Sequence, residues 1–135
     1  MSQENVEIVR RFIDAYNRRD REAVEALFHP EIEWHTITGP LLGVEAVHGR
    51  EESLHFMFEQ IPEGVEDFRV GLEEVRELSG GQVLAVAHYE GRGVTSGAAV
   101  EMSATQIYRF DAGLIVFFQD FASRDEALKA AGLSE

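Results

Sequence analysis

Two stretches of the chain carry side-chain types that could do chemistry. The first, LFHPEIEWH at residues 27–35, holds two histidines, two glutamates and the only tryptophan of the chain. The second, LIVFFQDF at residues 114–121, places Asp120 behind a run of apolar residues. Histidines and carboxylates at short spacing are typical of a metal site. A carboxylate in apolar surroundings is typical of an acid–base catalyst.

The histidines of the first stretch are not expected to converge on one point, as three or more metal ligands must. Pro30 disfavours helix at His29, which marks the end of a helical segment. In the strand expected over residues 31–36, alternation places Trp34 and His35 on opposite faces. We therefore expect no bound metal, and an apolar wall built by Trp34. The roles of three further histidines stay open: His48, His55 and His88.

Asp120 is the strongest single candidate for chemistry. It lies two positions beyond Phe118 and four beyond Val116, so the three residues are predicted to share one face of a strand. A carboxylate among such neighbours is poorly solvated, and we expect its pKa to be raised into the range useful for a general acid or base. In the alternative interpretation, Asp120 ends the strand and binds backbone donors near Ser123.

The elements that would position these side chains begin with helices. Apolar residues recur at helical spacing near the N-terminus, at Val6, Val9, Phe12, Ile13 and Tyr16. A short second helix is predicted after Asp20, which can cap it, through Phe28. A third helix is predicted near Glu51–Gln60, carrying Phe58, with IPEG as its stop.

From Val65 onward the chain has the pattern of strands separated by turns, with the hairpin signal DAG before the last strand. SRDE is a capping box, formed by Ser123 with Glu126, and it opens a terminal helix that Gly132 closes. Helices followed by a run of antiparallel strands indicate an α+β domain.

The last strand is apolar on both faces. The pattern places Leu114, Val116 and Phe118 on one face, and Ile115, Phe117 and Phe121 on the other. One face can cover the helices, and the second also needs to be buried. We therefore expect a homodimer through the outer face of the sheet.

Composition limits the classes of function. The length of 135 residues predicts a single domain over residues 1–135, with a hydrophobic core large enough to be stable without disulfides or structural metal ions. The formal charge of −13 disfavours binding to nucleic acid and to anionic lipid. The absence of cysteine excludes disulfides and thiolate chemistry, and no segment has the pattern of a signal peptide or a membrane span. We expect a cytoplasmic protein without membrane or nucleic-acid partners.

Four motifs resemble the SnoaL-like polyketide cyclase-related family within the nuclear transport factor 2-like and ketosteroid isomerase-like superfamily. They are VRRFIDAYNRRDREAVEALFHPEIEWH, HGREE, IYRFDAGLIVFFQDF and SRDEALKAAGL, which together span nearly the whole chain. The resemblance implies a cystatin-like α+β cone, in which N-terminal helices pack on a strongly curved, mixed and mainly antiparallel sheet. It also implies a short C-terminal helix and an apolar cavity at the wide end of the cone.

The resemblance further implies that the cavity binds a small apolar molecule. Asp120 matches the acid–base aspartate of the polyketide cyclases. Gln106 falls where those cyclases carry a histidine and where ketosteroid isomerase carries an oxyanion-stabilising aspartic acid, and its amide could donate to a developing enolate oxygen. The side chains expected to enclose the substrate are Phe12, Tyr16, Trp34, Thr36, Phe58, Tyr108 and Phe118.

The ketosteroid isomerase catalytic set is not retained, since its oxyanion tyrosine falls at Phe12 and its base aspartate falls near Thr36. Whether the protein is an enzyme stays open. One hypothesis is a cofactor-independent isomerase, cyclase or dehydratase that uses Asp120 on a carbonyl compound, without metal or organic cofactor. A second is a non-catalytic dimeric module that binds a small hydrophobic ligand, favoured if Asp120 is exposed. A third is a protein-interaction domain, favoured if Trp34 and Tyr108 pack together and leave no cavity.

Overall fold

The computed structural model describes residues 2–36 and 46–132. The helical elements are α1 (Ser2–Asn17), α2 (Arg21–Leu27), α3 (Arg50–His55), the π-helical turn η2 (Phe56–Gln60), α4 (Ile61–Gly64), the 3₁₀ turn η3 (Ser79–Gly81) and α5 (Arg124–Ala130). The strands are β1 (Phe28–His35), β2 (Val47–His48), β3 (Val65–Glu77), β4 (Val83–Gly93), β5 (Ala99–Asp111) and β6 (Leu114–Phe121).

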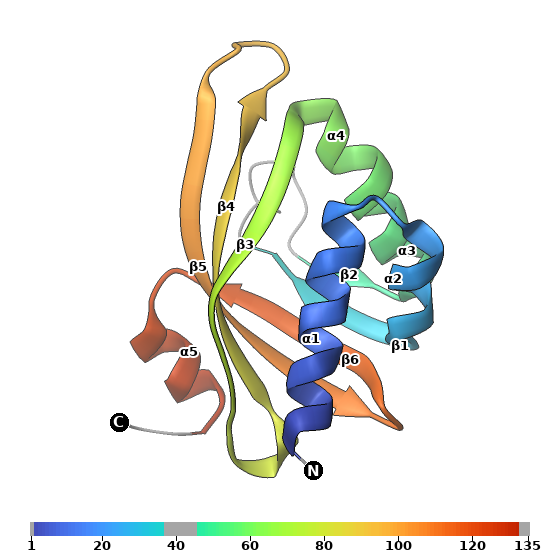
Figure 1. The fold of residues 1–135 in the computed structure, drawn as a ribbon, viewed down its shortest axis with the longest axis vertical. Coiled ribbons are helices and arrows are strands. Elements are labelled where there is room, and N and C mark those ends of the chain that lie inside the picture. Colours follow the sequence, from blue (N-terminus) through green and yellow to red (C-terminus); the bar gives the residue numbers. More distant parts are fainter. Residues whose placement is uncertain (1, 37–45, 133–135) are drawn as a thin grey trace.

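The strands form one mixed sheet in the order β2-β1-β6-β5-β4-β3. β1 and β6 run parallel to each other, while the other neighbouring strands are antiparallel. Figure 1 shows the sheet curving around α1, with α2, α3 and α4 on the same side and α5 on the opposite side. The predicted α+β cone, including its short C-terminal helix, is confirmed.

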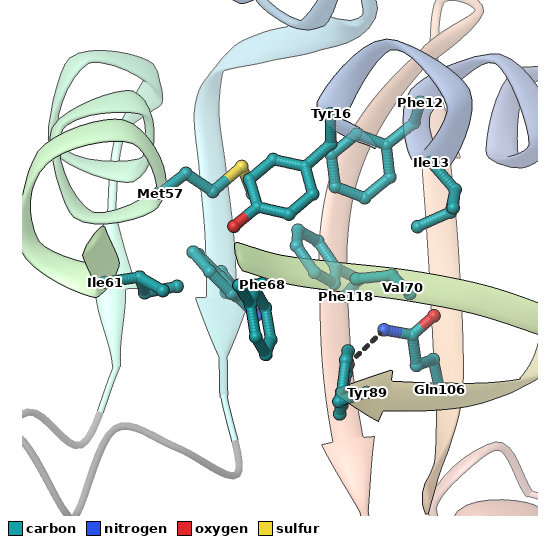
Figure 2. A pocket seen from close by; sticks show the side chains of 11 residues that line it. Phe12, Ile13, Tyr16, Met57, Ile61, Phe68, Val70, Tyr89, Gln106 and Phe118 are labelled. Atoms are coloured by element: carbon teal, nitrogen blue, oxygen red, sulfur yellow. Dashed lines mark hydrogen bonds between the residues drawn. The ribbon is translucent and has the colours of Figure 1, made fainter. Parts of the chain in front are cut away.

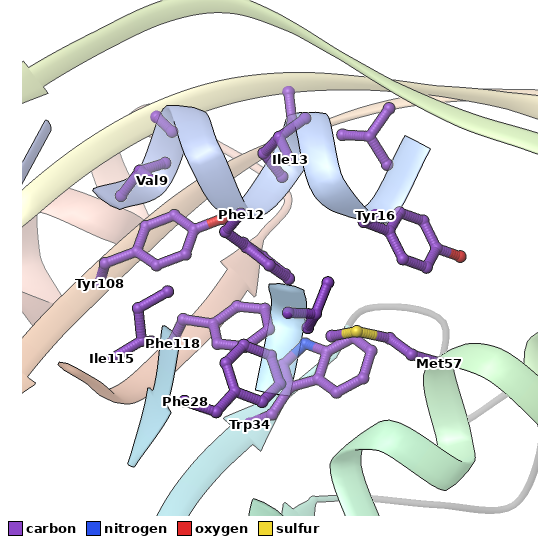
Figure 3. Close-up of a cluster of buried hydrophobic side chains, with 14 of the residues drawn as sticks. Val9, Phe12, Ile13, Tyr16, Phe28, Trp34, Met57, Tyr108, Ile115 and Phe118 are labelled. Carbon is purple, nitrogen blue, oxygen red and sulfur yellow. The ribbon is translucent and has the colours of Figure 1, made fainter. Parts of the chain in front are cut away.

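Helix α1 supplies one half of the main core. The apolar residues that predicted this helix are all buried, as Figure 3 shows for Val9, Phe12, Ile13 and Tyr16. They face the aromatic side chains of the sheet, and Phe12 packs 5.5 Å from Phe118 between ring centroids. The core between helix and sheet is therefore largely aromatic.

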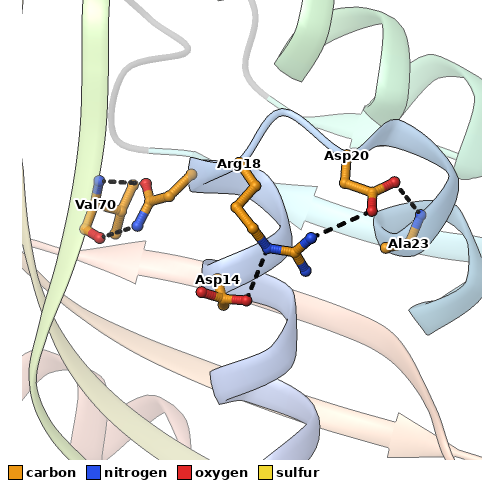
Figure 4. A network of polar contacts seen from close by, with 6 residues as sticks. Asp14, Arg18, Asp20, Ala23 and Val70 are labelled. Carbon is orange, nitrogen blue, oxygen red and sulfur yellow. Dashed lines mark hydrogen bonds and ion pairs between the residues drawn. The ribbon is translucent and has the colours of Figure 1, made fainter.

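Polar side chains fix the C-terminal end of α1. Asn17 holds the edge strand through both of its amide atoms, because Nδ2 donates to the carbonyl of Val70 (2.7 Å) and Oδ1 accepts from its N–H (3.0 Å). Arg18 binds Asp14 and Asp20, and Asp20 caps α2 by accepting from the N–H of Ala23, as predicted (Figure 4). These bonds place α1 across the concave face of the sheet.

Two predicted helix ends are wrong. Helix α2 ends at Leu27 rather than Phe28, because Phe28 is already extended and begins β1 ahead of Pro30. IPEG does not stop the third helix, which continues through η2 into α4 and ends at Gly64. Pro62 lies in the first turn of α4, where the helix leaves the π-helical turn η2, and it contributes no backbone N–H to the helical bonds there.

The predicted faces of the last strand are also wrong at its start. The pairing of β5 with β6 shifts between Arg109 and Phe110, which leaves Val116 as an extra residue. As a result Ile115, and not Val116, is buried in the core with Phe118, while Val116 is half-buried. A bulge reverses the alternation that the sequence pattern assumes.

Part of the outer face, the face of the sheet turned away from α1, is covered by the chain itself. Leu84 and Ile107 of the sheet are fully buried against Ala127 and Leu128 of α5, with Phe121 packed beside them. Ser123 caps this helix by accepting from the N–H of Glu126, as predicted. The apolar surface that a partner chain would have to cover on this face is therefore smaller than the sequence suggested.

The β5–β6 hairpin is the tight turn that DAG predicts. Asp111 pairs with Leu114, and the two residues between them both have positive φ, 53° at Ala112 and 78° at Gly113. Positive φ at both central positions defines a type I′ turn, whose twist matches that of the flanking strands. The turn fixes the register that brings β5 and β6 together.

Candidate functional site

Three aromatic rings stack in the centre of the sheet. The ring of Phe118 lies between those of Trp34 and Tyr108. The distance between ring centroids is 5.0 Å to Trp34 and 5.2 Å to Tyr108, and the angles between the ring planes are 18° and 9°. The register explains the stack, because Phe118 of β6 is directly opposite Trp34 of β1 and Tyr108 of β5. Parallel aromatic stacking adds about 0.5–1.5 kcal/mol per pair to the burial energy. The rings form a rigid floor under α1.

A small apolar cavity of about 40 Å³ lies between this floor and α1 (Figure 2). Its walls are almost entirely apolar or aromatic, and they consist of Phe12, Ile13, Tyr16, Trp34, Met57, Ile61, Phe68, Val70, Tyr89, Gln106 and Phe118. Among the described residues that line it, none is basic or acidic.

A buried polar cluster forms one end of the cavity. The hydroxyl of Tyr89 donates to Asp120 Oδ1 at 2.8 Å, and Gln106 Nε2 donates both to the Tyr89 oxygen (2.7 Å) and to Asp120 Oδ1 (3.0 Å). The hydroxyl of Tyr108 in turn donates to Gln106 Oε1 at 2.7 Å. All four side chains are buried, and Asp120 is only 8% exposed. A carboxylate is thus held behind a tyrosine that faces the cavity.

Strand register assembles this cluster. Gln106 and Asp120 are directly opposite each other on β5 and β6, so their side chains leave the same face of the sheet. Tyr89 reaches them from β4, and its ring stacks on Phe68 of β3 at 5.5 Å. Small buried residues such as Ala87 lie next to Tyr89 on the sheet, and they leave room for its ring.

Burial keeps the phenols of the site neutral. Burial first, and then the negative charge of Asp120, raises the pKa of Tyr89 well above its ordinary value, and the same two causes act on Tyr108. Burial also raises the pKa of Tyr16, which is part of α1, to about 12. At neutral pH each of these hydroxyls therefore carries its proton.

One buried donor at the cavity has no partner. The indole Nε1 of Trp34 makes no hydrogen bond within the described residues, although the side chain is only 6% exposed. A buried polar group without a partner costs about 1–3 kcal/mol. The Trp34 ring is held by Phe118 on one face and meets Phe56 edge-on at 5.2 Å. Its N–H direction is therefore fixed.

Comparison with family models identifies the chain. The model of the SnoaL-like domain matches residues 9–118. The chain belongs to the SnoaL-like domain family. A search of curated proteins found no match.

Solved structures share the fold of this SnoaL-like domain. An NTF2-like protein of unknown function from Burkholderia pseudomallei is 24% identical, with a TM-score of 0.78 over 93% of this chain and 95% of that one. A protein of ketosteroid isomerase-like fold from Catenulispora acidiphila, in complex with trimethylamine, is 20% identical (TM-score 0.73; 95% and 94% covered). A Mycobacterium tuberculosis protein in complex with estradiol-17β-hemisuccinate is 18% identical (TM-score 0.75; 90% and 95% covered).

The structure brings most of the predicted site residues together. Five of them line the cavity: Phe12, Tyr16, Trp34, Gln106 and Phe118. Asp120 lies behind the wall, in contact with Tyr89 and Gln106, and Tyr108 lies behind Phe118. Phe58 packs against Tyr16 at 5.7 Å, and Thr36 is buried at the end of β1, so both lie outside the lining.

Sequence reasoning missed Tyr89, although the signal was present. His88 alternates with Glu90 and Arg92 in the sequence, a pattern typical of a solvent-facing or interface charge ladder, and alternation then places Tyr89 on the inner face. The structure confirms the ladder, because His88 Nε2 lies 3.9 Å from carboxylates of Glu90 and Glu101. Met57, Ile61 and Phe68 were also missed as lining residues.

The histidines of this SnoaL-like domain are dispersed over its surface. Their carboxylate partners are Asp111 for His29 (3.2 Å), Glu33 for His35 (2.5 Å) and His48 (3.7 Å), and Glu59 for His55 (3.3 Å). His35 packs on Phe117 of the outer face, as its parity relative to Trp34 predicted. In the described parts of the chain, no three His, Asp or Glu side chains gather as metal ligands. Across the same residues, no helix is long and apolar enough to cross a membrane.

Proposed function

We propose that this SnoaL-like domain binds a small, largely apolar carbonyl compound and moves a proton on it. Asp120 acts as the general acid/base, and the reaction is an isomerisation, cyclisation or dehydration without metal or organic cofactor. The observation that carries this proposal is the buried contact of Asp120 with Tyr89 at the wall of an apolar cavity. A buried carboxylate in reach of a cavity is a typical acid–base arrangement.

Tyr89 connects the carboxylate to the ligand. Its hydroxyl donates to Asp120 Oδ1 and accepts from Gln106 Nε2, and the remaining lone pair of its oxygen accepts a proton from the ligand as its own proton passes to the carboxylate. The ligand loses one proton and Asp120 gains one, while Tyr89 ends with the proton count it began with. Return of the proton along the same route to a different atom of the ligand completes an isomerisation.

Gln106 and Tyr108 support this route from behind. The Gln106 amide nitrogen donates to Tyr89 and Asp120, and its oxygen accepts from Tyr108. The two residues therefore orient the acid–base pair. The wall around the ligand consists of Phe12, Tyr16, Trp34 and Phe118, backed by Phe58, Thr36 and Tyr108.

A non-catalytic binding module is the second candidate. The apolar lining of the cavity favours it, and two proteins of this fold are known in complex with organic molecules, estradiol-17β-hemisuccinate and trimethylamine. The burial of Asp120 argues for the catalytic alternative, since an exposed carboxylate was the expectation for a simple binder. A cavity also persists although Trp34 and Tyr108 both stack on Phe118, which disfavours a pure interaction domain.

Deuterium exchange tests the proposal without knowledge of the natural substrate. Cyclopentanone serves as an enolisable probe in D₂O, and NMR measures the loss of its α-hydrogens. We expect exchange above the buffer rate with the wild-type protein and a decrease of at least about 100-fold with Asp120→Asn, the usual contribution of a general acid or base. Circular dichroism checks that the variant is folded. Equal exchange rates for the wild type and a folded Asp120→Asn variant would contradict the proposal.

We also propose a homodimer through the outer face of the sheet. Val116 and Phe117 are half-buried there, beyond the part that α5 covers. Light scattering at micromolar concentration should give twice the 15.2 kDa chain mass. Phe117→Glu should then shift the mass toward the monomer, whereas Val94→Glu, at a 47% exposed position in the turn after β4, should not. A wild-type monomer would exclude this assembly.

A further inference from the structure

We propose that the indole N–H of Trp34 binds the oxygen of the ligand and thereby selects neutral carbonyl compounds. This inference rests on the proposed function, because it names the recognition element of the same cavity. Trp34 lines the cavity, is 6% exposed, and carries a donor without a partner in the described residues. In Figure 3 its indole nitrogen lies on the edge of the ring that is turned toward α1.

The hydrogen-bonding capacity of the wall leaves this role to Trp34. An indole N–H donates and never accepts, so its partner must be an acceptor oxygen or nitrogen. The Gln106 amide is already engaged inside the polar cluster, because its nitrogen donates to Tyr89 and Asp120 and its oxygen accepts from Tyr108. The Tyr89 hydroxyl donates to Asp120 and offers only an acceptor to the cavity.

The cavity wall therefore offers the ligand one hydrogen-bond donor and one hydrogen-bond acceptor. Trp34, on β1, offers a donor, and Tyr89, on β4, offers an acceptor backed by a carboxylate. An enolisable carbonyl compound matches both, since its oxygen accepts a hydrogen bond and the adjacent C–H can yield a proton. As that proton leaves, negative charge develops on the oxygen, where a fixed donor stabilises it most.

Charge restricts the ligand to a neutral molecule. No basic side chain is found among the described residues that line the cavity, and the chain carries a net charge of −13. A carboxylate ligand would be buried close to Asp120 without a counter-charge, which is strongly unfavourable. A ketone or aldehyde satisfies Trp34 without bringing a charge into the cavity.

The single tryptophan makes the inference directly measurable. In a ¹⁵N-labelled sample, the one indole N–H gives one resonance, which is assigned to Trp34 without further work. Cyclopentanone and cyclopentane serve as probes of matching ring size, with and without an acceptor oxygen. We expect cyclopentanone to move the indole proton downfield, as hydrogen bonding does, and cyclopentane to leave it without such a shift.

A matched pair of variants tests the same contact through affinity. Trp34→Phe keeps an aromatic ring but removes the donor, and should weaken cyclopentanone binding about tenfold, the effect of one hydrogen bond, with less than a twofold effect on cyclopentane. Ser103→Ala is the control: it removes an exposed hydroxyl of β5 that lies 3.4 Å from His88 Nδ1, away from the cavity lining, and it should leave both affinities unchanged. Titration of backbone amide shifts measures both affinities.

The outcomes separate this inference from the proposed function. A ketone-specific indole shift without deuterium exchange supports Trp34 as the oxygen anchor and overturns the catalytic proposal. Deuterium exchange with identical indole responses to both probes overturns the role of Trp34 and leaves the role of Asp120 intact. The inference is likewise overturned if Trp34→Phe weakens ketone binding no more than the control Ser103→Ala does, or if neither probe binds.

Discussion

Gln106 and Asp120 lie directly opposite each other on β5 and β6, and the amide nitrogen of Gln106 donates a 3.0 Å hydrogen bond to the carboxylate. The same nitrogen donates to Tyr89, so a single side chain orients both partners of the proposed proton route. Its own orientation is fixed by Tyr108, which donates to the amide oxygen. Three buried polar groups thus depend on one residue.

Replacing Gln106 tests this dependence through stability. Gln106→Met keeps the length of the side chain but removes its donors and its acceptor, which leaves the buried hydroxyl of Tyr108 unpaired. We expect the free energy of unfolding to fall by about 1–3 kcal/mol. Gln119→Met, the same change at a half-buried neighbour of Asp120, should alter it by less than about 0.5 kcal/mol. Urea unfolding measures both, and equal effects would contradict the cluster's importance.

Tyr89→Phe tests whether the proton passes through the hydroxyl. The variant removes the link between the cavity and Asp120, so deuterium exchange of cyclopentanone should fall as far as it does in Asp120→Asn. Tyr108→Phe is the matched control, since it removes a buried hydroxyl of the same cluster that lies outside the route. It should change the exchange rate by less than about tenfold, although both variants lose about 1–3 kcal/mol of stability. Similar rates for the two variants would exclude the relay.

The ion pair of Glu74 with Arg124 predicts a pH dependence of stability. Two 2.9 Å contacts join β3 to the start of α5, and the hydrogen bond from Arg124 is the main cause that lowers the pKa of Glu74. A lowered pKa in the folded state means that the stabilisation is present above the unfolded-state pKa near 4.5 and is lost as the pH falls through the folded-state value. Because both side chains are about one-third exposed, we expect less than about 1 kcal/mol.

The measurement for this pair is urea unfolding at pH 7 and at pH 3. Glu74→Gln should be less stable than the wild type at pH 7, and the difference should disappear at pH 3. Glu73→Gln removes the same charge from an exposed neighbour that forms no ion pair within the described residues. A difference for Glu74→Gln that persists unchanged at pH 3 would show that the ion pair is not its cause.

The hairpin turn offers a route to higher stability. Ala112 has a φ of 53°, a left-handed conformation that costs an L-residue with a β-carbon about 1–2 kcal/mol. Ala112→Gly should therefore raise the free energy of unfolding, by up to about 1 kcal/mol after the greater chain entropy of glycine is subtracted. Gly113→Ala, at a φ of 78° in the same turn, should lower it. Thermal unfolding would reveal both signs, and a stabilising Gly113→Ala would refute the argument.

Local sequence patterns predict this fold well where a helix cap or a turn depends on one or two residues. Asp20 and Ser123 cap their helices as their positions indicate, and DAG forms the expected turn. The failures depend on features that short sequence patterns do not carry. The bulge at Val116 arises from pairing with β5, and the continuation past IPEG depends on η2, which local propensity does not reveal.

The candidate site was predictable only in part for a similar reason. Alternation along each strand placed Trp34, Gln106 and Asp120 on inner faces, and all three are buried there. It did not reveal that the Tyr89 side chain extends from β4 to Asp120 and fills the space between Asp120 and the cavity. That contact requires small side chains on the neighbouring strand, which the pattern of a single strand does not show. Nor did it reveal an unpaired indole N–H, since hydrogen-bond satisfaction is a property of the assembled cavity.

The parallel pairing of β1 with β6 also sets the order in which the protein can fold. Strand β1 ends at His35, yet its long neighbour begins only at Leu114, so the two halves of the sheet meet after most of the chain exists. Such a distant contact is slow to form because a large loop must close first. During synthesis, β1 has only the two-residue β2 as a neighbour, on one edge, and its other edge is unpaired until β6 arrives. A chain truncated before Leu114 should therefore aggregate rather than fold, which makes the last strand the step that commits the domain to its native state.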